Sequence, residues 1–244
     1  MTAPPDQPLA GRTIGLTRPE AGALGAHLTE LGAAVVHVPL LAIAEPADGG
    51  ASLRRALARL AAFDWVVVTS RNGAEAVGAA VAAHPAVRLA AVGPTTGATL
   101  ADLAGRPVDL VATVPRVDGL LAEFPGPAAR VLVAQADRAG DELTGGLTAR
   151  GHDVEAVVAY ATVSRRPPVE EVARLDAVDA VVFASGSAVE SWVEARGPSM
   201  PPVIVAVGPM TARAARRFGV TVTHVAASPD PAGVGAALVA ALHR

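Results

Sequence analysis

Short runs rich in valine and isoleucine alternate along the chain with longer stretches rich in alanine and leucine. Most runs are apolar throughout, which is typical of parallel strands buried on both faces. The stretches between them show helical spacing, for example at Leu24, Leu28 and Leu31, with Pro19 placed for a first helical turn. This alternation predicts an α/β fold with parallel sheets flanked by helices. The runs occupy residues 12–17, 34–38, 64–69, 89–92, 108–112, 130–134, 153–160, 179–184, 203–207 and 220–225.

Part of the sequence is written twice. Residues 91–96 read AVGPTT and residues 206–211 read AVGPMT, an offset of 115 (206 − 91 = 115). The same offset places DWVVVTS, which begins at Asp64, over DAVVFAS, which begins at Asp179. These segments form a repeated unit B and its copy B′.

A weaker repeat has an offset of 119 (143 − 24 = 119) and relates the leucine, glycine and valine positions of residues 24–38 to those of 143–157. These segments are a unit A and its copy A′, so the chain order is A, B, A′, B′. Extended connectors follow both, at 39–44 and 160–164. The connectors could pair as a small ladder between two lobes, or A with B and A′ with B′ could form simple tandem lobes.

The composition excludes several classes of protein. The chain is 51% hydrophobic but only 3% aromatic, so its core consists of alanine, valine and leucine. A net charge of −3 gives no basic field for nucleic acid. Because there is no cysteine, disulfides and thiolate zinc sites are excluded. The six histidines form no HExxH or HxxxH pair, and we expect no metal.

The N-terminal stretch MTAPPDQPLAG has neither a basic region nor an apolar region of the kind found in signal peptides. We expect it to be a disordered lead-in. No apolar run approaches the roughly 18 residues that span a bilayer. A soluble, cytoplasmic protein is therefore expected.

Ligands of open α/β sheets bind beyond the carboxyl ends of the strands. Here most of those positions carry small hydroxyl residues or glycine at an expected helix start, where backbone N–H groups and the helix dipole favour carboxylates or phosphates. The structural alternative is that the hydroxyls are ordinary N-caps and the glycines allow tight turns. The strand exits read Thr17-Arg18, Thr69-Ser70-Arg71-Asn72, Gly93-Pro94-Thr95-Thr96, Gln135-Ala136-Asp137-Arg138, Ser185-Gly186-Ser187 and Gly208-Pro209-Met210-Thr211.

Several catalytic motifs are missing. No GxGxxG follows a strand, and neither GxxxxGK[ST] nor GxSxG occurs, which disfavours nucleotide binding and Ser/His/Asp hydrolysis. The only tyrosine, Tyr160, stands at the connector after A′. Its phenol is either a buried structural group or one that hydrogen-bonds a departing or attacking oxygen.

The order of these motifs resembles the uroporphyrinogen-III synthase family over about residues 11–243. The matching segments, in chain order, are Thr-Arg-Pro at 17–19, Pro-Leu at 39–40, Asp-x-Val-Val-x-Thr-Ser at 64–70, Val-Gly-x-x-Thr at 92–96, the tyrosine at 160, Val-x-Phe-x-Ser at 181–185 and Val-Gly-x-x-Thr-Ala at 207–212.

The resemblance implies two similar α/β lobes joined by a two-stranded β-ladder. Lobe 1 would combine residues 1–38 with 165–244, from A and B′, and lobe 2 would be 45–158, from B and A′. Residues 39–44 and 159–164 would be the linker strands. Each lobe then carries one copy of the repeated phrase, as a helix N-terminus presented to a bound tetrapyrrole.

The resemblance also implies the reaction. Hydroxymethylbilane, a linear tetrapyrrole with eight carboxylates, loses its terminal hydroxyl as water to give an azafulvene. Ring D attacks through its substituted carbon to form a spirocyclic pyrrolenine, and fragmentation and reclosure invert ring D and give uroporphyrinogen III, on the way to heme, siroheme and cobalamin. No cofactor or metal is implied, and the expected partner is the small-molecule substrate alone, with no nucleic acid or membrane and a monomeric protein.

Site residues follow by matching positions. Tyr160 matches the family's linker tyrosine, placed to assist loss of the hydroxyl. Four matching hydroxyls line the site: Ser70, Thr96, Ser185 and Thr211. Their charge alone suggests that three arginines bind carboxylates of the substrate: Arg18, Arg71 and Arg138. They are explained at least as well as ordinary solvated arginines on the surface. The remaining substrate contacts expected at the strand exits are Asn72, Gly93, Thr95, Gly186, Ser187 and Gly208.

Two positions depart from the family's pattern. Gln135-Ala136 replaces a family-like Arg-Gly, and Met210 stands where threonine is common. An alternative function is a non-catalytic, two-lobed binder or sensor of an anionic, tetrapyrrole-like ligand. A phosphate or nucleotide-sugar transferase is disfavoured because a phosphate loop and a metal-binding aspartate pair are missing.

Overall fold

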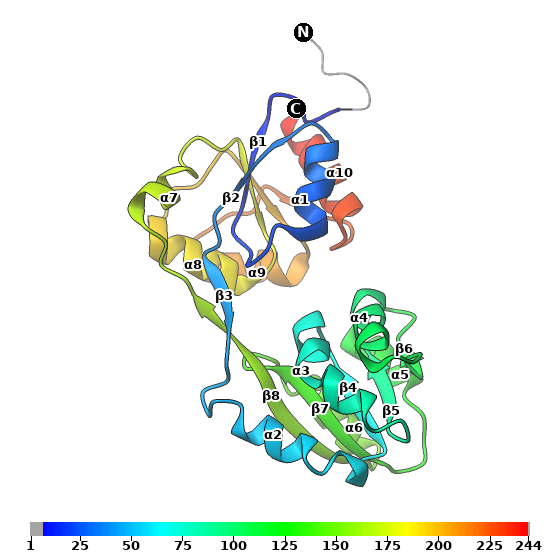
Figure 1. The fold of residues 1–244 in the computed structure, drawn as a ribbon. Helices are drawn as coiled ribbons and strands as arrows, with labels where there is room; N and C mark the ends of the chain where they lie inside the picture. Colours follow the sequence, from blue (N-terminus) through cyan, green and yellow to red (C-terminus); the bar gives the residue numbers. More distant parts are fainter. Residues whose placement is uncertain (1–6, 244) are drawn as a thin grey trace. The chain divides into compact units, whose positions relative to one another are not determined.

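The computed structural model of the chain describes residues 7–243. Its backbone forms two sheets, each covered by helices (Figure 1). The chain divides into two compact units: unit 1 combines residues 1–42 with 163–244, and unit 2 comprises residues 43–162. The predicted α/β class, with parallel sheets flanked by helices, is confirmed.

Unit 1 contains a five-stranded sheet in the order β11-β10-β9-β1-β2, with every neighbouring pair parallel. Its strands are β1 (Thr13–Leu16), β2 (Ala34–His37), β9 (Ala180–Phe183), β10 (Val203–Ala206) and β11 (His224–Val225). One face packs against helices α1 (Gly22–Glu30) and α10 (Pro231–Leu242). The other face packs against α8 (Gly186–Arg196) and α9 (Pro209–Arg217), and the short α7 (Val169–Ala173) precedes β9.

Unit 2 contains the strand order β8-β7-β4-β5-β6, again parallel throughout, with β3 beside β8. Four strands lie wholly within unit 2: β4 (Trp65–Val68), β5 (Arg88–Ala91), β6 (Leu110–Val111) and β7 (Arg130–Ala136). Strands β3 (Leu41–Ala44) and β8 (Asp153–Ser164) each continue across the boundary between the units. One face carries α2 (Ala51–Leu57), η1 (Leu60–Ala62), α3 (Arg71–Ala82) and α4 (Pro94–Ala104). The other carries α5 (Val117–Glu123) and α6 (Glu142–Ala149).

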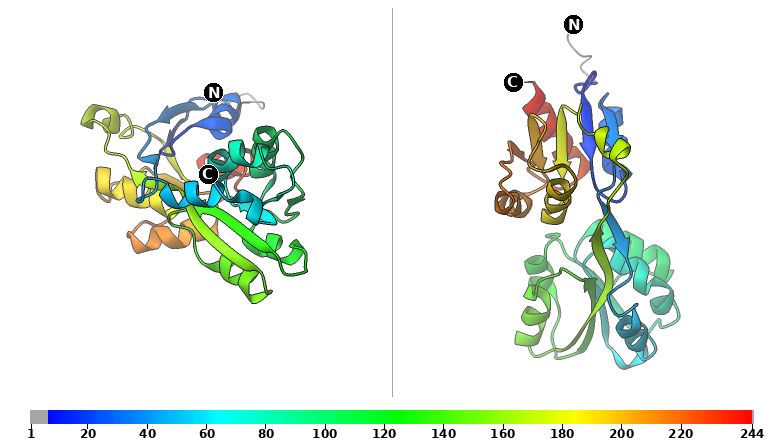
Figure 2. Two further views of the ribbon diagram at one scale, coloured as in Figure 1. Left: turned by 60° about the horizontal axis from the view of Figure 1, so that its bottom comes forward. Right: turned by 90° about the vertical axis from the view of Figure 1, so that its left-hand side faces the viewer.

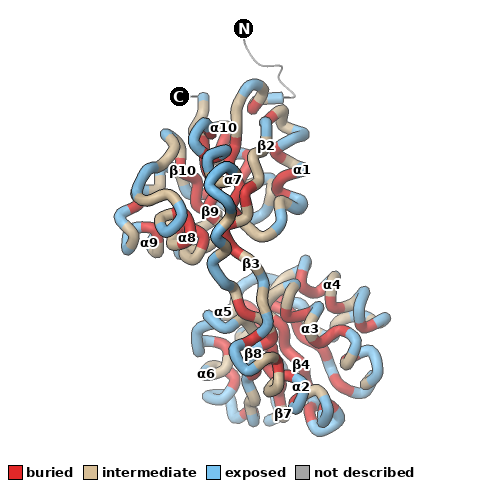
Figure 3. The backbone as a smooth tube through the Cα atoms, turned by 60° about the vertical axis from the view of Figure 1, so that its left-hand side comes forward, coloured by how far each residue is buried: buried red, intermediate tan, exposed pale blue. Residues whose placement is uncertain are grey.

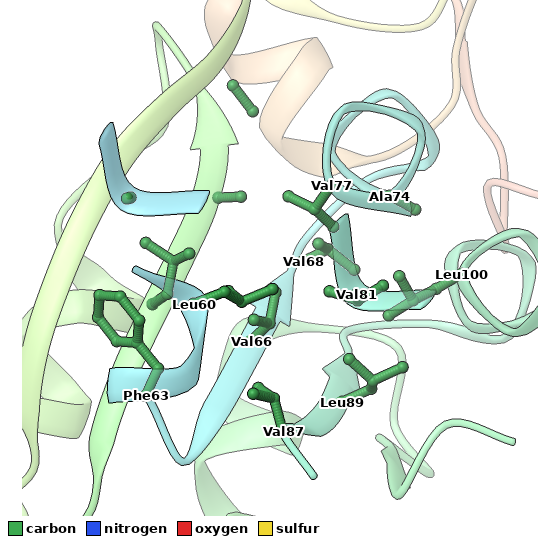
Figure 4. Packing of buried hydrophobic residues seen from close by; sticks show 14 of the residues in the cluster. Leu60, Phe63, Val66, Val68, Ala74, Val77, Val81, Val87, Leu89 and Leu100 are labelled. Atoms are coloured by element: carbon green, nitrogen blue, oxygen red, sulfur yellow. The ribbon is translucent and has the colours of Figure 1, made fainter. Parts of the chain in front are cut away.

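Strand β4 shows why the central runs are apolar throughout. Val66 and Val68 enter the core beneath α3 and α4 (Figure 4). Trp65 and Val67 enter the core beneath α5 and α6. Successive side chains of a strand point to opposite faces, so a strand covered on both sides needs apolar residues at every position. The central strands β1, β4, β9 and β10 are accordingly buried, whereas the helices expose their outer faces (Figure 3). Helices lie on both sides of each sheet (Figure 2).

The internal repeat is visible in the strand order. Read from one edge, unit 1 runs β2-β1-β9-β10-β11 and unit 2 runs β8-β7-β4-β5-β6. Strands β1 and β2 come from A, and β9 to β11 from B′, whereas unit 2 joins B with A′. The tandem alternative is wrong, because β1 pairs with β9 rather than with β4. The connector strands β3 and β8 are neighbours, as a linker ladder requires.

Three local expectations are wrong. Residues 7–11 are not a disordered lead-in, since Leu9 is fully buried and its N–H donates to the carbonyl oxygen of Leu31 at 2.8 Å; residues 1–6 lie outside the described part of the chain. Pro19 lies before α1, which begins at Gly22. Of the run 220–225, only His224 and Val225 form a strand. Among the described residues, no helix combines the length and apolar character of a bilayer-spanning segment.

Candidate active site

The strand order locates a switch point in each unit. In unit 1 the chain passes from β1 to β2 toward one edge of the sheet, and from β9 to β10 toward the other edge. In unit 2 it passes from β7 to β8 toward one edge, and from β4 to β5 toward the other. A crevice at the carboxyl ends of such a strand pair is the usual ligand site of open α/β sheets. At this edge of unit 1, Thr17 follows β1 and Ser185 comes shortly after β9. At this edge of unit 2, Ser70 comes shortly after β4 and Asp137 follows β7.

In unit 2 the structure brings Tyr160 and Ser70 together. The phenol O–H of Tyr160 donates to Ser70 Oγ at 3.0 Å, although 90 positions separate the two residues. Tyr160 stands on β8 opposite Ala136, beyond a register shift in β7, and Ser70 follows β4. Because β7 lies between β8 and β4, this hydrogen bond crosses the carboxyl end of β7 at the switch point.

Ser70 also caps helix α3, since its Oγ accepts the N–H of Gly73 at 3.1 Å. The structural alternative considered for the strand-exit hydroxyls therefore applies to Ser70, and it applies equally to Ser185, whose Oγ accepts the N–H of Ala188 at 3.2 Å in unit 1. Capping uses only one of the two acceptor positions of Ser70, because its Oγ also accepts a hydrogen bond from the phenol of Tyr160. With both acceptor positions occupied, the Ser70 hydroxyl proton is directed away from the protein groups that bind it.

The repeated phrase forms the same structure in both units. Gly93 and Gly208 are the N-cap residues of α4 and α9, and proline occupies the first turn of each helix, as the sequence predicts. The φ angles of the two glycines are −152° and −175°, which is extended backbone that any residue adopts, so the expectation that they allow tight turns is wrong. A Cβ at Gly93 would meet Pro115 at 3.3 Å, whereas one at Gly208 would meet nothing within 4 Å.

The remaining predicted contacts of the phrase divide by burial. Thr96 and Thr211 are 9% and 6% exposed, and the hydroxyl of Thr211 lies 3.5 Å from the carbonyl oxygen of Ala184, just past β9. Thr95 is exposed in the first turn of α4. Gly186 has a packing role, since a Cβ there would lie 2.7 Å from Cβ of Ala214 in α9. Asn72 and Ser187 are partly buried and lie in the first turns of α3 and α8, respectively.

Two of the six strand exits do not lead directly into a helix, contrary to the general expectation. Thr17-Arg18 is followed by a bend before α1, and Gln135-Ala136 extends β7 before a turn at Asp137-Arg138 that precedes α6. The carboxylate of Asp137 accepts the N–H of Thr162 at 3.0 Å, so this side chain holds the end of β8.

The predicted arginines occupy different environments. Arg71 forms an ion pair with Glu75 on the next turn of α3, with Nε 2.9 Å from Oε1, and more than half of its side chain is exposed. Arg138 is exposed in the turn after β7. Arg18 is half-buried, and its carbonyl oxygen lies 2.9 Å from Nε2 of His37. Among residues 7–243, no His, Cys, Asp and Glu side chains gather in a group that would hold a metal ion.

Sequence reasoning missed one polar group at the edge of unit 1. Thr17 is 1% exposed, and its Oγ1 has no hydrogen-bond partner among the described residues. An unpaired buried hydroxyl costs about 1–3 kcal/mol. A threonine after a buried strand gives no sign of this in the sequence, because capping and solvent exposure would have been equally ordinary outcomes.

Comparison with known proteins identifies the family. The profile described as uroporphyrinogen-III synthase HemD matches residues 22–235. Uroporphyrinogen-III synthase of Synechococcus elongatus is 33% identical over 166 residues, which cover 64% of this chain and 62% of that protein. The chloroplastic uroporphyrinogen-III synthase of Oryza sativa is 28% identical over 181 residues, covering 68% and 60%. Both matches span less than two thirds of the relative's length.

Solved structures support the fold. Uroporphyrinogen-III synthetase of Helicobacter pylori superimposes with a TM-score of 0.64 at 15% identity, over 95% of this chain and 99% of that one. A mutant uroporphyrinogen III synthase of Thermus thermophilus gives 0.60 at 22% identity, over 96% and 99%. The profile covers most of the sequence, and the likeness of fold covers nearly all of it. This chain belongs to the uroporphyrinogen-III synthase family.

Proposed function

We propose that this protein is a uroporphyrinogen-III synthase, which cyclises hydroxymethylbilane with loss of water and inversion of ring D to give uroporphyrinogen III in tetrapyrrole biosynthesis. The observation that carries the proposal is the hydrogen bond between Tyr160 and Ser70 at the switch point of unit 2, in a chain of this family.

The two hydroxyls are arranged to act on a ligand oxygen. Ser70 Oγ accepts from the N–H of Gly73 and the phenol of Tyr160, which leaves its own proton to donate outward. A leaving hydroxyl placed there receives a hydrogen bond from Ser70 that the phenol strengthens, since linked hydrogen bonds polarise one another. Proton donation of this kind assists departure of water and formation of the azafulvene.

Binding is assigned to the helix starts at the carboxyl edges. In each unit, the N-termini of two helices follow the central strands: α3 and α4 in unit 2, and α8 and α9 in unit 1. Their first-turn N–H groups and dipoles suit the carboxylates of the substrate. The reaction needs little covalent help from the protein, and its main demand is to hold the chain so that the rearranging closure outruns direct closure to isomer I.

The proposal includes the finer expectations about the protein's setting. The protein acts without a cofactor, as a monomer in the cytoplasm, with the tetrapyrrole as its only partner. Dialysis against a chelator should leave the activity intact, and the mass in solution should match one chain of 24.4 kDa.

The test is to add the protein to hydroxymethylbilane, oxidise the products and separate the porphyrin isomers by chromatography. Isomer III well above the level without protein is the expected result, and Tyr160→Phe should lower the rate while the far-UV circular dichroism stays unchanged. A non-catalytic binder would associate with the octacarboxylate yet give only isomer I, and that outcome would reject the proposal.

A further inference from the structure

Helix α9 carries a strongly basic exposed face. Its three arginines, Arg213, Arg216 and Arg217, are all exposed, and no carboxylate or carbonyl among residues 7–243 binds their guanidinium groups. Met210, in the first turn, is 69% exposed. The buried face of the helix is formed by residues such as Thr211 and Ala215. In a chain whose net charge is −3, such a concentration of unpaired positive charge needs an explanation.

Most arginines elsewhere in the described chain are bound. Nη2 of Arg59 lies 2.7 Å from Glu155, Nη1 of Arg165 lies 3.1 Å from Glu171, and Arg196 pairs with Asp176. On α9 the arginines instead face one another at spacings of three and four residues. Like charges at these spacings disfavour a helix. The arrangement is therefore not one that stabilises the isolated protein.

The internal repeat shows that the fold does not require these charges. At the offset of 115, α4 of unit 2 occupies the same place as α9 and has Ala98 where α9 has Arg213 (213 − 115 = 98). Two of the arginines have a local explanation, because Arg216 and Arg217 lie in the last turn, where cations interact favourably with the helix dipole. Arg213, in the middle of the helix, has no such explanation.

The direction of α9 brings Arg213 toward the carboxyl edge of unit 1. The helix starts at that edge, directly after β10, and Arg213 is four residues from its first residue, a rise of about 6 Å. Side chains of a helix lean toward its N-terminus, so the long guanidinium side chain extends toward the edge. Met210 precedes Arg213 by three residues and therefore lies on the same face, nearer the edge.

We propose that Arg213 binds a carboxylate of the tetrapyrrole ligand and that Met210 packs against the apolar surface of the adjoining pyrrole ring. This inference rests on the proposed function, which supplies the ligand. Arg213 and Met210 then determine affinity for the multiply carboxylated substrate and take no part in the loss of water.

Arg213→Gln tests the proposal in the intact chain. With hydroxymethylbilane as substrate, the variant should raise KM roughly twofold to fivefold while kcat stays within twofold, the range expected for loss of a charge pair that water still reaches. Added salt should raise the KM of the original protein more than that of the variant, because screening acts on the charge that the variant lacks. Arg213→Lys should recover part of the affinity, and Met210→Ala should raise KM about twofold to threefold.

Two matched controls remove the same charge elsewhere. Arg217→Gln changes the far end of α9, and Arg174→Gln changes an exposed arginine in the segment that leads to the opposite, amino edge of β9. Both should leave KM within twofold. Equal effects of all three substitutions, or no effect of Arg213→Gln, would overturn the inference. The proposed function fails separately, through production of isomer I alone by the unchanged protein, and direct binding of uroporphyrin III, followed by tryptophan fluorescence, would still measure the contribution of Arg213.

Discussion

The hydrogen bond between Tyr160 and Ser70 makes a quantitative prediction about stability that does not depend on the substrate. Tyr160→Phe removes the phenol oxygen, but Ser70 Oγ keeps the N–H of Gly73, so no buried polar group loses its only partner. We expect the free energy of unfolding to fall by about 0.5–1 kcal/mol. Ser70→Ala removes both the cap of α3 and the acceptor of the phenol, and should cost about 1–2 kcal/mol.

The double variant separates the hydrogen bond from the other effects. Each single variant already lacks the hydrogen bond. The double variant should therefore lose less unfolding free energy than the sum of the two single losses, by about 0.5–1 kcal/mol. Urea unfolding measures this, and each unit contains one buried reporter, Trp192 in unit 1 and Trp65 in unit 2. In a Trp192→Phe background, fluorescence follows unit 2 alone. Strictly additive losses would show that the two hydroxyls do not interact in solution, and would remove the basis for their joint role.

Three further predictions concern other parts of the molecule. Thr17→Val should raise the free energy of unfolding by about 1 kcal/mol, because it removes an unpaired buried hydroxyl at constant shape; a loss in urea unfolding, recovered by Thr17→Ser, would show that the hydroxyl has a partner such as water. Gly186→Ala should lower the melting temperature through overpacking against α9, whereas Gly208→Ala, with open space and extended backbone, should change it little. The pKa of Asp230 lies below its ordinary value because the hydroxyl of Ser228 and backbone N–H groups donate to the carboxylate, so its stabilisation is present above about pH 4 and is lost as pH falls through the lowered pKa; Asp230→Asn, which still caps α10, should show a shallower acid transition.

The central strands were predictable because a strand buried on both faces is apolar at nearly every position, a pattern that the sequence shows directly. The helix starts at Pro94 and Pro209 and the serine caps were also predictable from the sequence. Helix capping involves only residues within about three positions of one another, so neighbouring residues in the chain determine it. The start of α1 was missed because the chain bends at Arg18-Pro19 and the helix begins only at Gly22, whose φ of 52° is a left-handed conformation that the apolar pattern does not record. Leu9 was missed because its partner, Leu31, is distant in the sequence and its own neighbourhood is rich in proline.

The site was predictable only in part, for the same reason. Sequence position identified Ser70 and Tyr160 separately, but their hydrogen bond depends on the strand order β8-β7-β4, which hydrophobic periodicity does not determine. The unpaired hydroxyl of Thr17 depends on what covers the end of β1, and the unpaired charge of Arg213 depends on the absence of carboxylates across a tertiary surface. None of these conditions is a property of neighbouring residues in the chain.

The repeat offers a way to separate folding from function in this protein. Groups that both copies share are those the fold uses, as Ser70 and Ser185 both cap a helix. Groups present in one copy alone are not needed to build the unit. The position equivalent to Tyr160 in the other copy is Leu41, at the offset of 119 (160 − 119 = 41), and the position equivalent to Arg213 is Ala98. If catalysis required only a pair of symmetric anion-binding edges, these differences would have no consequence. A linear substrate with chemically distinct ends needs distinct edges, so we expect catalysis to depend on Tyr160, which only one copy places beside its serine, and affinity to depend on Arg213.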